Sequence, residues 1–403
     1  MNILFLTIGR MESIEDHAIY PDLLRQFRDA GHAVYTVSTR EKRLGLPTEY
    51  REDHGAHALR VQIGNITKCG LIEKGISTVA IEGQYKRAIR QYISDVRFDL
   101  VLYSTPPITL AGVVKYIKRR DHASTYLLLK DIFPQNAVDL GMMSRRGIKA
   151  PLYWYFRRRE KQLYAISDRI GCMSQANVDY LLRHNPELAP QKAEVCPNSI
   201  DVVDLRISQA EREAIREKYG IPPDKRVFVY GGNLGKPQGI PFLIDCLKTQ
   251  EQNTEAYFLI VGNGTEFGKL QAYFDAMQPK NMKLLKSIPK EDYDRMAAAC
   301  DVGMIFLDHR FTIPNFPSRL LSYLQAGLPV LACTDPNTDI GKVIVDGGFG
   351  WWCESNDAGG FGEVIYEALR TDTGIMGENA RIYLSEHYHA EKAYQIIIGR
   401  NHV

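Results

Sequence analysis

A helix start near residue 317 carries the residue types best suited to holding an anion. Pro317 suits the first position of a helix, and Ser318 leaves free backbone N–H groups beside a hydroxyl. Gly327 ends that helix before a buried strand. A helix N-terminus offers unpaired N–H donors and a partial positive charge, and Arg319 adds a bidentate guanidinium. The spacing predicts a diphosphate site, with a plain capped helix and a surface arginine as the alternative.

A glycine-rich turn follows the expected strand 227–230 and opens a helical pattern. Gly232 and Gly235 would let the backbone come close to phosphate oxygens. We expect Arg319 to neutralise most of the phosphate charge, assisted by Arg310 ahead of the helix or by Lys236 in this turn. For both side chains a solvated surface charge is the alternative.

Titratable side chains also follow two expected strands of the first half. Asp131 comes directly after the apolar strand 126–129, where ligands of open sheets bind, and could orient a hydroxyl or accept its proton. Its alternative role is that of a helix-capping carboxylate. A loop from Gly9 to His17, with Glu15 and Asp16, follows the first strand. We predict Asp131, Arg319 and His17 as catalytic residues, and Gly9, Glu15 and Asp16 as an acceptor-side loop.

Short apolar runs alternate with amphipathic segments along the chain, which predicts that an α/β fold positions these residues. In the first half we expect strands at 3–8, 34–38, 100–103, 126–129 and 169–173. In the second half we expect strands at 227–230, 258–261, 282–285, 303–306 and 330–332. The pattern breaks near residues 197–201, so we predict two Rossmann-like domains, over 1–200 and 201–384, facing each other across a cleft.

Composition is that of an ordinary globular protein. The chain has 403 residues, is 45% apolar and 24% charged, and has a net charge of +2, so any anion site must be local. The seven scattered cysteines form no C-x-x-C or Cys/His run, which predicts a reducing compartment and no structural zinc. No basic leader and no apolar run of bilayer length is present, so we expect a cytoplasmic protein.

Residues 145–163 combine many basic side chains and a single acid, Glu160, with interleaved aromatic residues. Such a helix can lie in the headgroup layer of an anionic membrane, and we expect peripheral contact with the inner membrane face through this segment. Two alternatives remain: a helix with one face in the core and the other solvated, and a nucleic-acid-binding helix. We expect no nucleic acid as partner.

Several segments, in order, resemble retaining glycosyltransferase family four. Residues 317–330 are similar to its donor-binding motif, written P-S-[KR]-x-x-E-Y-x-x-x-G-x-P-V. Its other characteristic turns and linker are matched by residues 196–201, 230–239, 261–264 and 288–291. Residues 130–141 resemble a stretch of the fucosaminyltransferase-like branch of bacterial surface-polysaccharide biosynthesis.

The resemblance implies a GT-B fold, with a C-terminal helix over 385–403 packing back on the first domain. It also implies transfer of a sugar, with retention of configuration, from a nucleotide-diphosphate donor, expected to be a UDP-sugar, to a lipid-linked saccharide. No metal ion or other cofactor is expected, and the chain has no Asp-x-Asp signature. The donor-binding residues expected in this way are Gly232, Asn233, Lys236, Gly262, Ser287, Ile288, Arg310, Pro317, Ser318, Arg319 and Ser322.

Two departures from the family pattern concern the donor. Most members carry two glutamates, which contact the transferred sugar and the ribose, where this chain has Pro314 and Ser322. A serine hydroxyl can meet a ribose hydroxyl but lacks the charge and reach of a carboxylate. A non-catalytic glycosyltransferase partner subunit therefore remains as an alternative. A sugar-nucleotide epimerase or hydrolase is the other alternative, because a fold alone does not fix the reaction.

Overall fold

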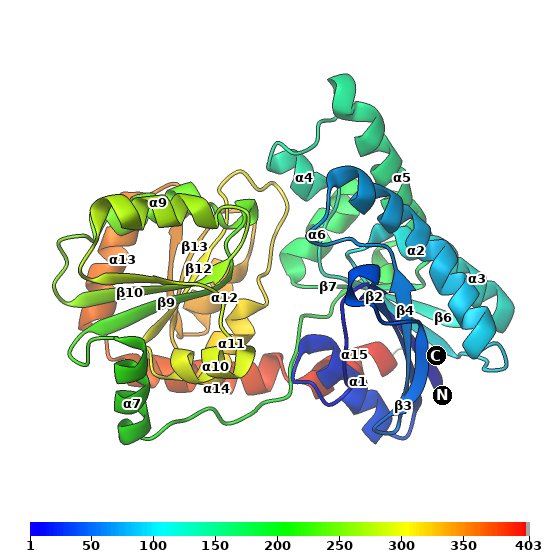
Figure 1. Ribbon diagram of the computed structural model, residues 1–403, viewed down its shortest axis with the longest axis horizontal. Coiled ribbons are helices and arrows are strands. Elements are labelled where there is room, and N and C mark those ends of the chain that lie inside the picture. Colours follow the sequence, from blue (N-terminus) through cyan, green and yellow to red (C-terminus); the bar gives the residue numbers. More distant parts are fainter. Residues whose placement is uncertain (400–403) are drawn as a thin grey trace. The chain divides into compact units, whose positions relative to one another are not determined.

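The chain forms two compact units in the computed structural model, which describes residues 1–399 apart from the side chains of Leu71 and Ile72 (Figure 1). The first unit comprises Met1–Asp201 together with the chain from His389 onward. The second comprises Val202–Tyr388. Each unit is an α/β layered structure around a mostly parallel sheet, so the predicted fold class is confirmed.

The first unit is built on an eight-stranded sheet of order β3-β4-β2-β1-β5-β6-β7-β8. Its strands are β1 (Asn2–Leu6), β2 (Ala33–Glu41), β3 (Glu49–Asp53), β4 (Ala56–Ile63), β5 (Leu100–Ser104), β6 (Ser124–Leu129), β7 (Arg169–Cys172) and β8 (Ala193–Val195). All pairs are parallel except β3 with β4. The sequence did not predict β3, β4 or β8, because the first two form a hairpin rich in polar residues and β8 is very short.

Helices cover both faces of this sheet. One face holds α1 (Ile19–Asp29) and α15 (Ala390–Ile398), and the other holds α2 (Leu71–Tyr92), α3 (Ala111–Asp121), α5 (Ala150–Ile166) and α6 (Gln175–His184). The strands are buried on both faces, so apolar side chains of β1 alternate between the two cores. The helix expected over 385–403 is instead the end of α14 (Thr373–His387), a break, and α15, which packs on α1. Its residues 400–403 lie outside the described residues.

The second unit has a six-stranded parallel sheet of order β11-β10-β9-β12-β13-β14. Its strands are β9 (Arg226–Asn233), β10 (Ala256–Asn263), β11 (Met282–Leu285), β12 (Val302–Phe306), β13 (Val330–Thr334) and β14 (Gly350–Glu354). Only β14 was not predicted. The order reverses at β9, which has β10 on one side and β12 on the other, and this is a topological switch point where sheet ligands bind.

The helices of the second unit are also divided between the two faces of the sheet. They are α7 (Gln209–Tyr219), α8 (Ile240–Thr249), α9 (Phe267–Met277), α10 (Lys290–Ala298), α11 (Arg319–Ala326), α12 (Ile340–Asp346), α13 (Ala358–Arg370) and α14. α8, α9 and α13 share one apolar core, and α10, α11 and α14 lie on the opposite side (Figure 1). The predicted stop of α11 at Gly327 is present, and the glycine takes the left-handed conformation with φ 67°.

Candidate functional site

A pocket of about 730 Å³ opens at the carboxyl edge of the second sheet, beside the switch point. The ends of β9 and β10 form one part of it, because Gly232 and Gly262 are paired across these two strands. The loop after β11 and the starts of α10 and α11 complete it. The lining residues are Gly231, Gly232, Asn233, Gln238, Val261, Gly262, Asn263, Ser287, Ile288, Lys290, Tyr293, Pro317, Ser318, Arg319, Ser322 and Tyr323.

The start of α11 differs in detail from the predicted cap. The helix begins at Arg319, so Pro317 lies before the helix and not in its first position. Ser318 has helical dihedral angles (φ −64°, ψ −17°), and its hydroxyl makes no capping hydrogen bond. The first turn closes through hydrogen bonds from Leu320 N to Pro317 O (3.2 Å) and from Leu321 N to Ser318 O (3.1 Å). The N–H groups of the preceding residues, Ser318 and Arg319, have no acceptor within the helix and are left at the pocket, as an anion site requires.

Arg319 is held between a tyrosine ring and the glycine-rich turn. Its Cζ atom lies 4.3 Å from the centre of the Tyr230 ring. Gly232, with φ +122°, approaches so closely that an added Cβ would lie 3.5 Å from Nη2 of Arg319. The Nη1 atom is buried and has no hydrogen-bond partner within the described chain. A buried guanidinium nitrogen without a partner is costly, and an anionic oxygen of a ligand would satisfy it.

Two further tyrosines support this arrangement, and the sequence analysis did not single them out. The Tyr323 Oη accepts a hydrogen bond from Gly231 N (3.2 Å) and lies 3.2 Å from Val229 O and 3.1 Å from Met304 O. Tyr293 fills the space beside Gly231, where an added Cβ would lie 1.9 Å from its hydroxyl oxygen. Burial raises the pKa of Tyr293 and of Tyr323, so both phenols stay neutral at pH 7 and leave the Arg319 charge uncompensated.

Close contact between two turns fixes the glycine side of the pocket. A Cβ on Gly262 would lie 1.9 Å from the carbonyl oxygen of Gly232, so only glycine fits there without movement of the backbone. Gln238 Oε1 accepts hydrogen bonds from Asn233 Nδ2 (3.2 Å) and Gly235 N (3.1 Å), which closes the turn.

Nine of the predicted donor-binding residues line this pocket: Gly232, Asn233, Gly262, Ser287, Ile288, Pro317, Ser318, Arg319 and Ser322. Lys236 and Arg310 do not line it. Lys236 is exposed on a short 3-10 turn, and Arg310 donates two hydrogen bonds to the buried Asp308 carboxylate, at 2.8 and 2.7 Å. Lys290, which sequence reasoning missed, lines the pocket and forms an ion pair with Asp294 (2.6 Å).

Asp131 follows β6 at the carboxyl edge of the first sheet. Its two carboxylate oxygens accept hydrogen bonds from Asn136 Nδ2, at 2.8 and 2.9 Å. Burial raises the pKa of Asp131 to about 6, against the hydrogen bonds from Ile132 and Asn136 that lower it. A carboxyl group with this pKa can exchange a proton near neutral pH.

The predicted acceptor-side loop is bound largely to its own surroundings. Gly9 N donates to Thr7 Oγ1 (2.9 Å), and Asp16 Oδ2 accepts from Ser13 N (3.0 Å). Glu15 forms an ion pair with Arg28, and this hydrogen bond lowers the pKa of Glu15. His17 is exposed. The four predicted residues, Gly9, Glu15, Asp16 and His17, do not line the pocket of the second unit.

Within residues 1–399, no group of three or more His, Cys, Asp or Glu side chains is arranged to hold a metal ion. In the same part of the chain, no helix is both long enough and apolar enough to cross a bilayer.

Comparison with known proteins places this pocket in a recognised domain. Residues 211–383 match the family described as "Glycosyl transferases group 1". "Probable glycosyltransferase WbjE" of Pseudomonas aeruginosa is 25% identical over 295 residues, which cover 72% of this chain and 71% of that protein. WcaI of Escherichia coli, whose name describes a colanic acid biosynthesis glycosyl transferase, is 21% identical over 61% of this chain and 60% of its own length.

Solved structures resemble the chain over nearly its whole length. Sucrose-phosphate synthase of Thermosynechococcus elongatus superposes with a TM-score of 0.76 at 15% identity, covering 98% of this chain and 97% of that one. HepE of Anabaena, solved in complex with UDP-glucose, gives a TM-score of 0.69 at 15% identity, covering 99% and 98%.

The fold is therefore that of the GT-B glycosyltransferases. The part of the second unit that matches the group 1 glycosyltransferase family, residues 211–383, includes the pocket at the start of α11.

Proposed function

We propose that the protein transfers a sugar, with retention of configuration, from a UDP-sugar to a lipid-linked saccharide in bacterial surface-polysaccharide synthesis. The observation that carries the proposal is the buried, unpartnered Nη1 of Arg319 at the N-terminus of α11, inside a pocket of about 730 Å³. Guanidinium nitrogen, helix N–H groups and closely approaching glycines together suit a diphosphate. The polysaccharide context rests on WcaI, and the UDP-sugar rests on HepE.

In this proposal the residues of the pocket do the work of a metal ion. As the bond between sugar and diphosphate breaks, negative charge grows on the leaving phosphate oxygens. The helix start and Arg319 stabilise that charge without reorganising, because both are already fixed by their neighbours. Ser322 lines the pocket and offers a hydroxyl to the donor. Asp131, with its pKa raised to about 6, orients the acceptor hydroxyl or accepts its proton.

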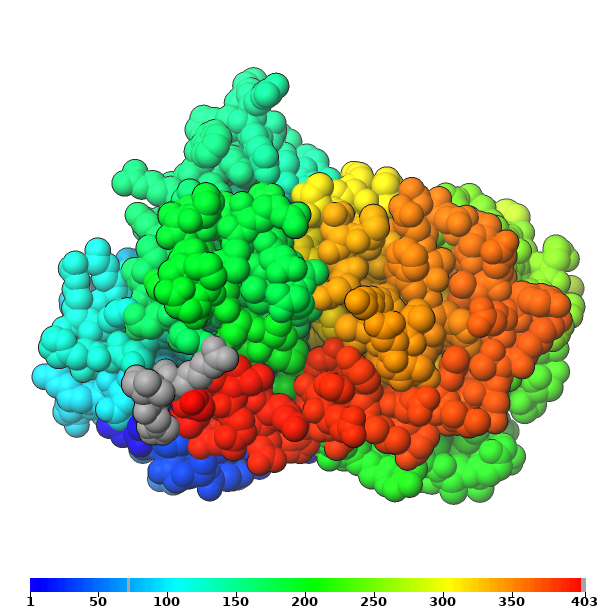
Figure 2. Space-filling model, turned by 180° about the vertical axis from the view of Figure 1, so that it is seen from behind, coloured from blue at the N-terminus to red at the C-terminus, as the bar shows by residue number. Residues whose placement is uncertain are grey.

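Membrane contact is part of the proposal and rests on the surface of the segment 145–163. Figure 2 shows the corresponding part of the first unit as a protruding knob, near colour 150 of the bar. Ile148 is fully exposed, and Leu152 and Trp154 are 51% and 58% exposed. Arg146 and Lys149 are exposed beside them. Apolar and basic side chains on one protrusion suit insertion into an anionic lipid surface.

The test of the proposed function is calorimetric titration of UDP and a panel of UDP-sugars, with and without EDTA, followed by product analysis with a polyprenyl-diphosphate saccharide. We expect UDP binding and sugar transfer that persist in EDTA, with the anomeric configuration of the donor kept. Turnover only with added divalent cation would refute metal independence. Donor consumption at the same rate without acceptor would indicate a hydrolase instead.

A further inference from the structure

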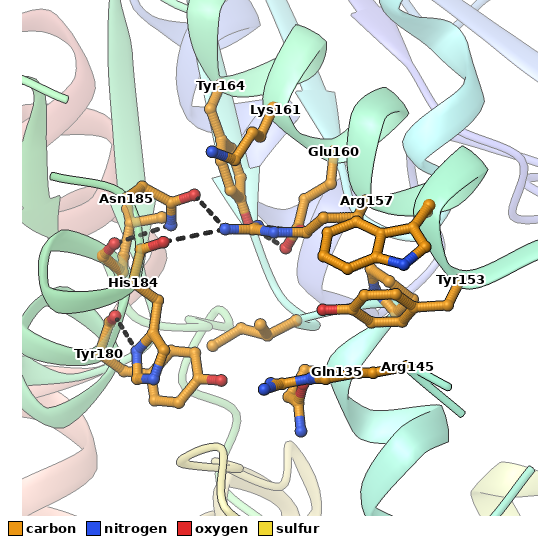
Figure 3. A pocket seen from close by; sticks show the side chains of 14 residues that line it. Gln135, Arg145, Tyr153, Arg157, Glu160, Lys161, Tyr164, Tyr180, His184 and Asn185 are labelled. Atoms are coloured by element: carbon orange, nitrogen blue, oxygen red, sulfur yellow. Dashed lines mark hydrogen bonds and ion pairs between the residues drawn. The ribbon is translucent and has the colours of Figure 1, made fainter. Parts of the chain in front are cut away.

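The first unit contains a second pocket, of about 250 Å³, between α4 (Gln135–Asp139), α5 and α6 (Figure 3). Ile132, Pro134 and Gln135, which follow β6, contribute to its lining together with residues of α5 and α6. Its lining combines charged side chains, such as Arg145, Arg157 and Glu160, with aromatic ones, such as Tyr153, Trp154 and Tyr180.

One wall of this pocket is an ion pair between a partly exposed arginine, Arg157, and a buried carboxylate, Glu160. Glu160 is 3% exposed and accepts hydrogen bonds from Arg157 and from the Tyr164 hydroxyl, the latter at 2.7 Å. Arg157 also donates to His184 O (2.9 Å) and Asn185 Oδ1 (2.7 Å), as Figure 3 shows. Such a network holds the side chains in one arrangement before any ligand arrives.

A cationic side chain stands at another wall. Arg145 donates to the neutral amide of Gln135, and its Cζ lies 5.8 Å from the centre of the Tyr153 ring. None of the ion pairs found among the described residues includes Arg145, and Gln135, its hydrogen-bond partner, donates in turn to Asp139 Oδ1 (2.6 Å). The exposed guanidinium therefore keeps its charge available to an anion. By contrast, Lys161 is paired with Glu187 at 3.0 Å.

Aromatic rings form the remaining walls. Tyr180 and His184 stack with their centres 3.9 Å apart, and Tyr153 meets Trp154 edge to face at 5.0 Å. Trp154 is 58% exposed although it lines a pocket, so it offers an open apolar face. Flat faces that bury C–H groups, next to side chains that can hydrogen-bond hydroxyls, suit a sugar ring.

The pocket also adjoins the predicted proton acceptor. Ile132, the residue after Asp131, is part of its lining. The pKa of Glu160 is raised chiefly by burial and further by the negative charge of Asp131, so the two carboxyl groups lie within electrostatic range.

We propose that this pocket binds a sugar phosphate, the phosphate on Arg145 and one sugar ring against the aromatic faces. A volume of about 250 Å³ is below the range of about 300–1,000 Å³ for drug-sized ligands, which suits one ring and its phosphate and is too small for a nucleoside diphosphate. This inference rests on the proposed function, in which it places the phosphate-linked sugar of the acceptor. The exposed apolar side chains of Ile148 and Leu152 lie, in that order, in the 3-10 turn that leads into α5 and at the start of α5. An exposed apolar surface on a helix that lines the pocket suits an acceptor held at a lipid surface.

The test is calorimetric titration of the full chain, saturated with UDP so that the pocket of the second unit is filled. The probes are glucose 1-phosphate, N-acetylglucosamine 1-phosphate, inorganic phosphate and UMP, each compared with vesicles that contain a polyprenyl-phosphate sugar. We expect a hexose 1-phosphate to bind, and Arg145→Gln to weaken it about tenfold or more. The matched control is Arg158→Gln, an exposed arginine of α5 outside the pocket lining, which should change affinity less than about twofold.

Each outcome decides something. If the chain binds the vesicles but not the free sugar phosphates, and Arg145→Gln weakens vesicle binding, the ligand comes from the lipid-linked source. If vesicles and free sugar phosphates bind with equal affinity, the pocket recognises the sugar phosphate that they share. If neither source binds, if inorganic phosphate binds equally well, or if UMP binds better, the inference is overturned. UDP affinity is measured in every variant. If the native chain does not bind UDP, the proposed function is refuted. If the native chain binds UDP but no sugar phosphate, only this inference is refuted.

Discussion

The Cζ atom of Arg319 lies 4.3 Å from the centre of the Tyr230 ring, so the first residue of α11 is fixed against the strand that leads into the glycine-rich turn. The stacked guanidinium cannot swing into solvent without losing this contact. Two structural parts that bind phosphate in many proteins, a helix start and a glycine turn, are thereby joined through one side chain.

Replacement of Arg319 tests this arrangement. Arg319→Met should weaken UDP binding by about 2 kcal/mol, roughly thirtyfold in Kd, because a charge-assisted hydrogen bond to phosphate is lost while the packing on Tyr230 is partly kept. Calorimetric titration measures the change. The control Arg310→Gln should stay within about threefold, because Arg310 is bonded to Asp308 outside the pocket. Equal losses in both variants would show that long-range charge, and not the Arg319 contact, holds UDP.

A pair of glycine substitutions tests the contact between the two turns. Gly262→Ala should lower the free energy of unfolding by about 2 kcal/mol, because the new Cβ would meet Gly232 O at 1.9 Å. Gly268→Ala in α9 meets nothing within 4 Å and should be neutral or stabilising by up to about 1 kcal/mol. Urea unfolding measures both changes, and a stable Gly262→Ala variant would argue against the close approach.

Asp131 should make stability depend on pH. Burial raises its pKa from 3.8 to about 6, so the folded chain binds this proton more tightly than the unfolded chain does. The resulting stabilisation is present below pH 3.8 and is lost as the pH rises through 6. Relative to Asp131→Asn, the native chain should lose about 2 kcal/mol between pH 4.5 and 7.5.

Urea unfolding at the two pH values gives that difference. Asp335, whose pKa burial also raises to about 6, is present in both proteins and cancels in the comparison. A difference that does not change with pH would contradict the raised pKa of Asp131.

The ion pair at the first-unit pocket should be costly to break from one side. Arg157→Met leaves the Glu160 carboxylate buried without its cation and should lower the free energy of unfolding by about 3 kcal/mol at pH 7. Adding Glu160→Gln removes the stranded charge while an acceptor for the Tyr164 hydroxyl remains, so we expect the double variant to recover at least half of the loss. An additive loss in the double variant would show that the pair is not coupled.

Much of the fold could be predicted from the sequence, because buried parallel strands leave long apolar runs and helices leave periodic ones. The strands near residues 3, 126, 227 and 258 were placed within a few residues of their observed bounds. Strands β3, β4 and β14 were not predicted. Polar side chains interrupt the apolar pattern of β3 and β4, and β14 lies at the edge of its sheet. The position of Pro317 outside the helix was not predicted either, because caps are decided by local dihedral angles.

By itself the sequence determined the fold class, the two series of strands, the choice of Gly232 and Asp131 as residues at or just after the ends of strands, and the choice of Arg319 at a helix start. Those features are local, because each strand, turn or helix start is recognised from residues that are neighbours in the sequence. Only the tertiary structure decided that Tyr293 and Tyr323 support the glycine turn, that Arg310 is bonded to Asp308, and that α4, α5 and α6 enclose a second pocket. These are contacts between distant segments, set by how helices pack on the sheets, and no short stretch of sequence encodes them.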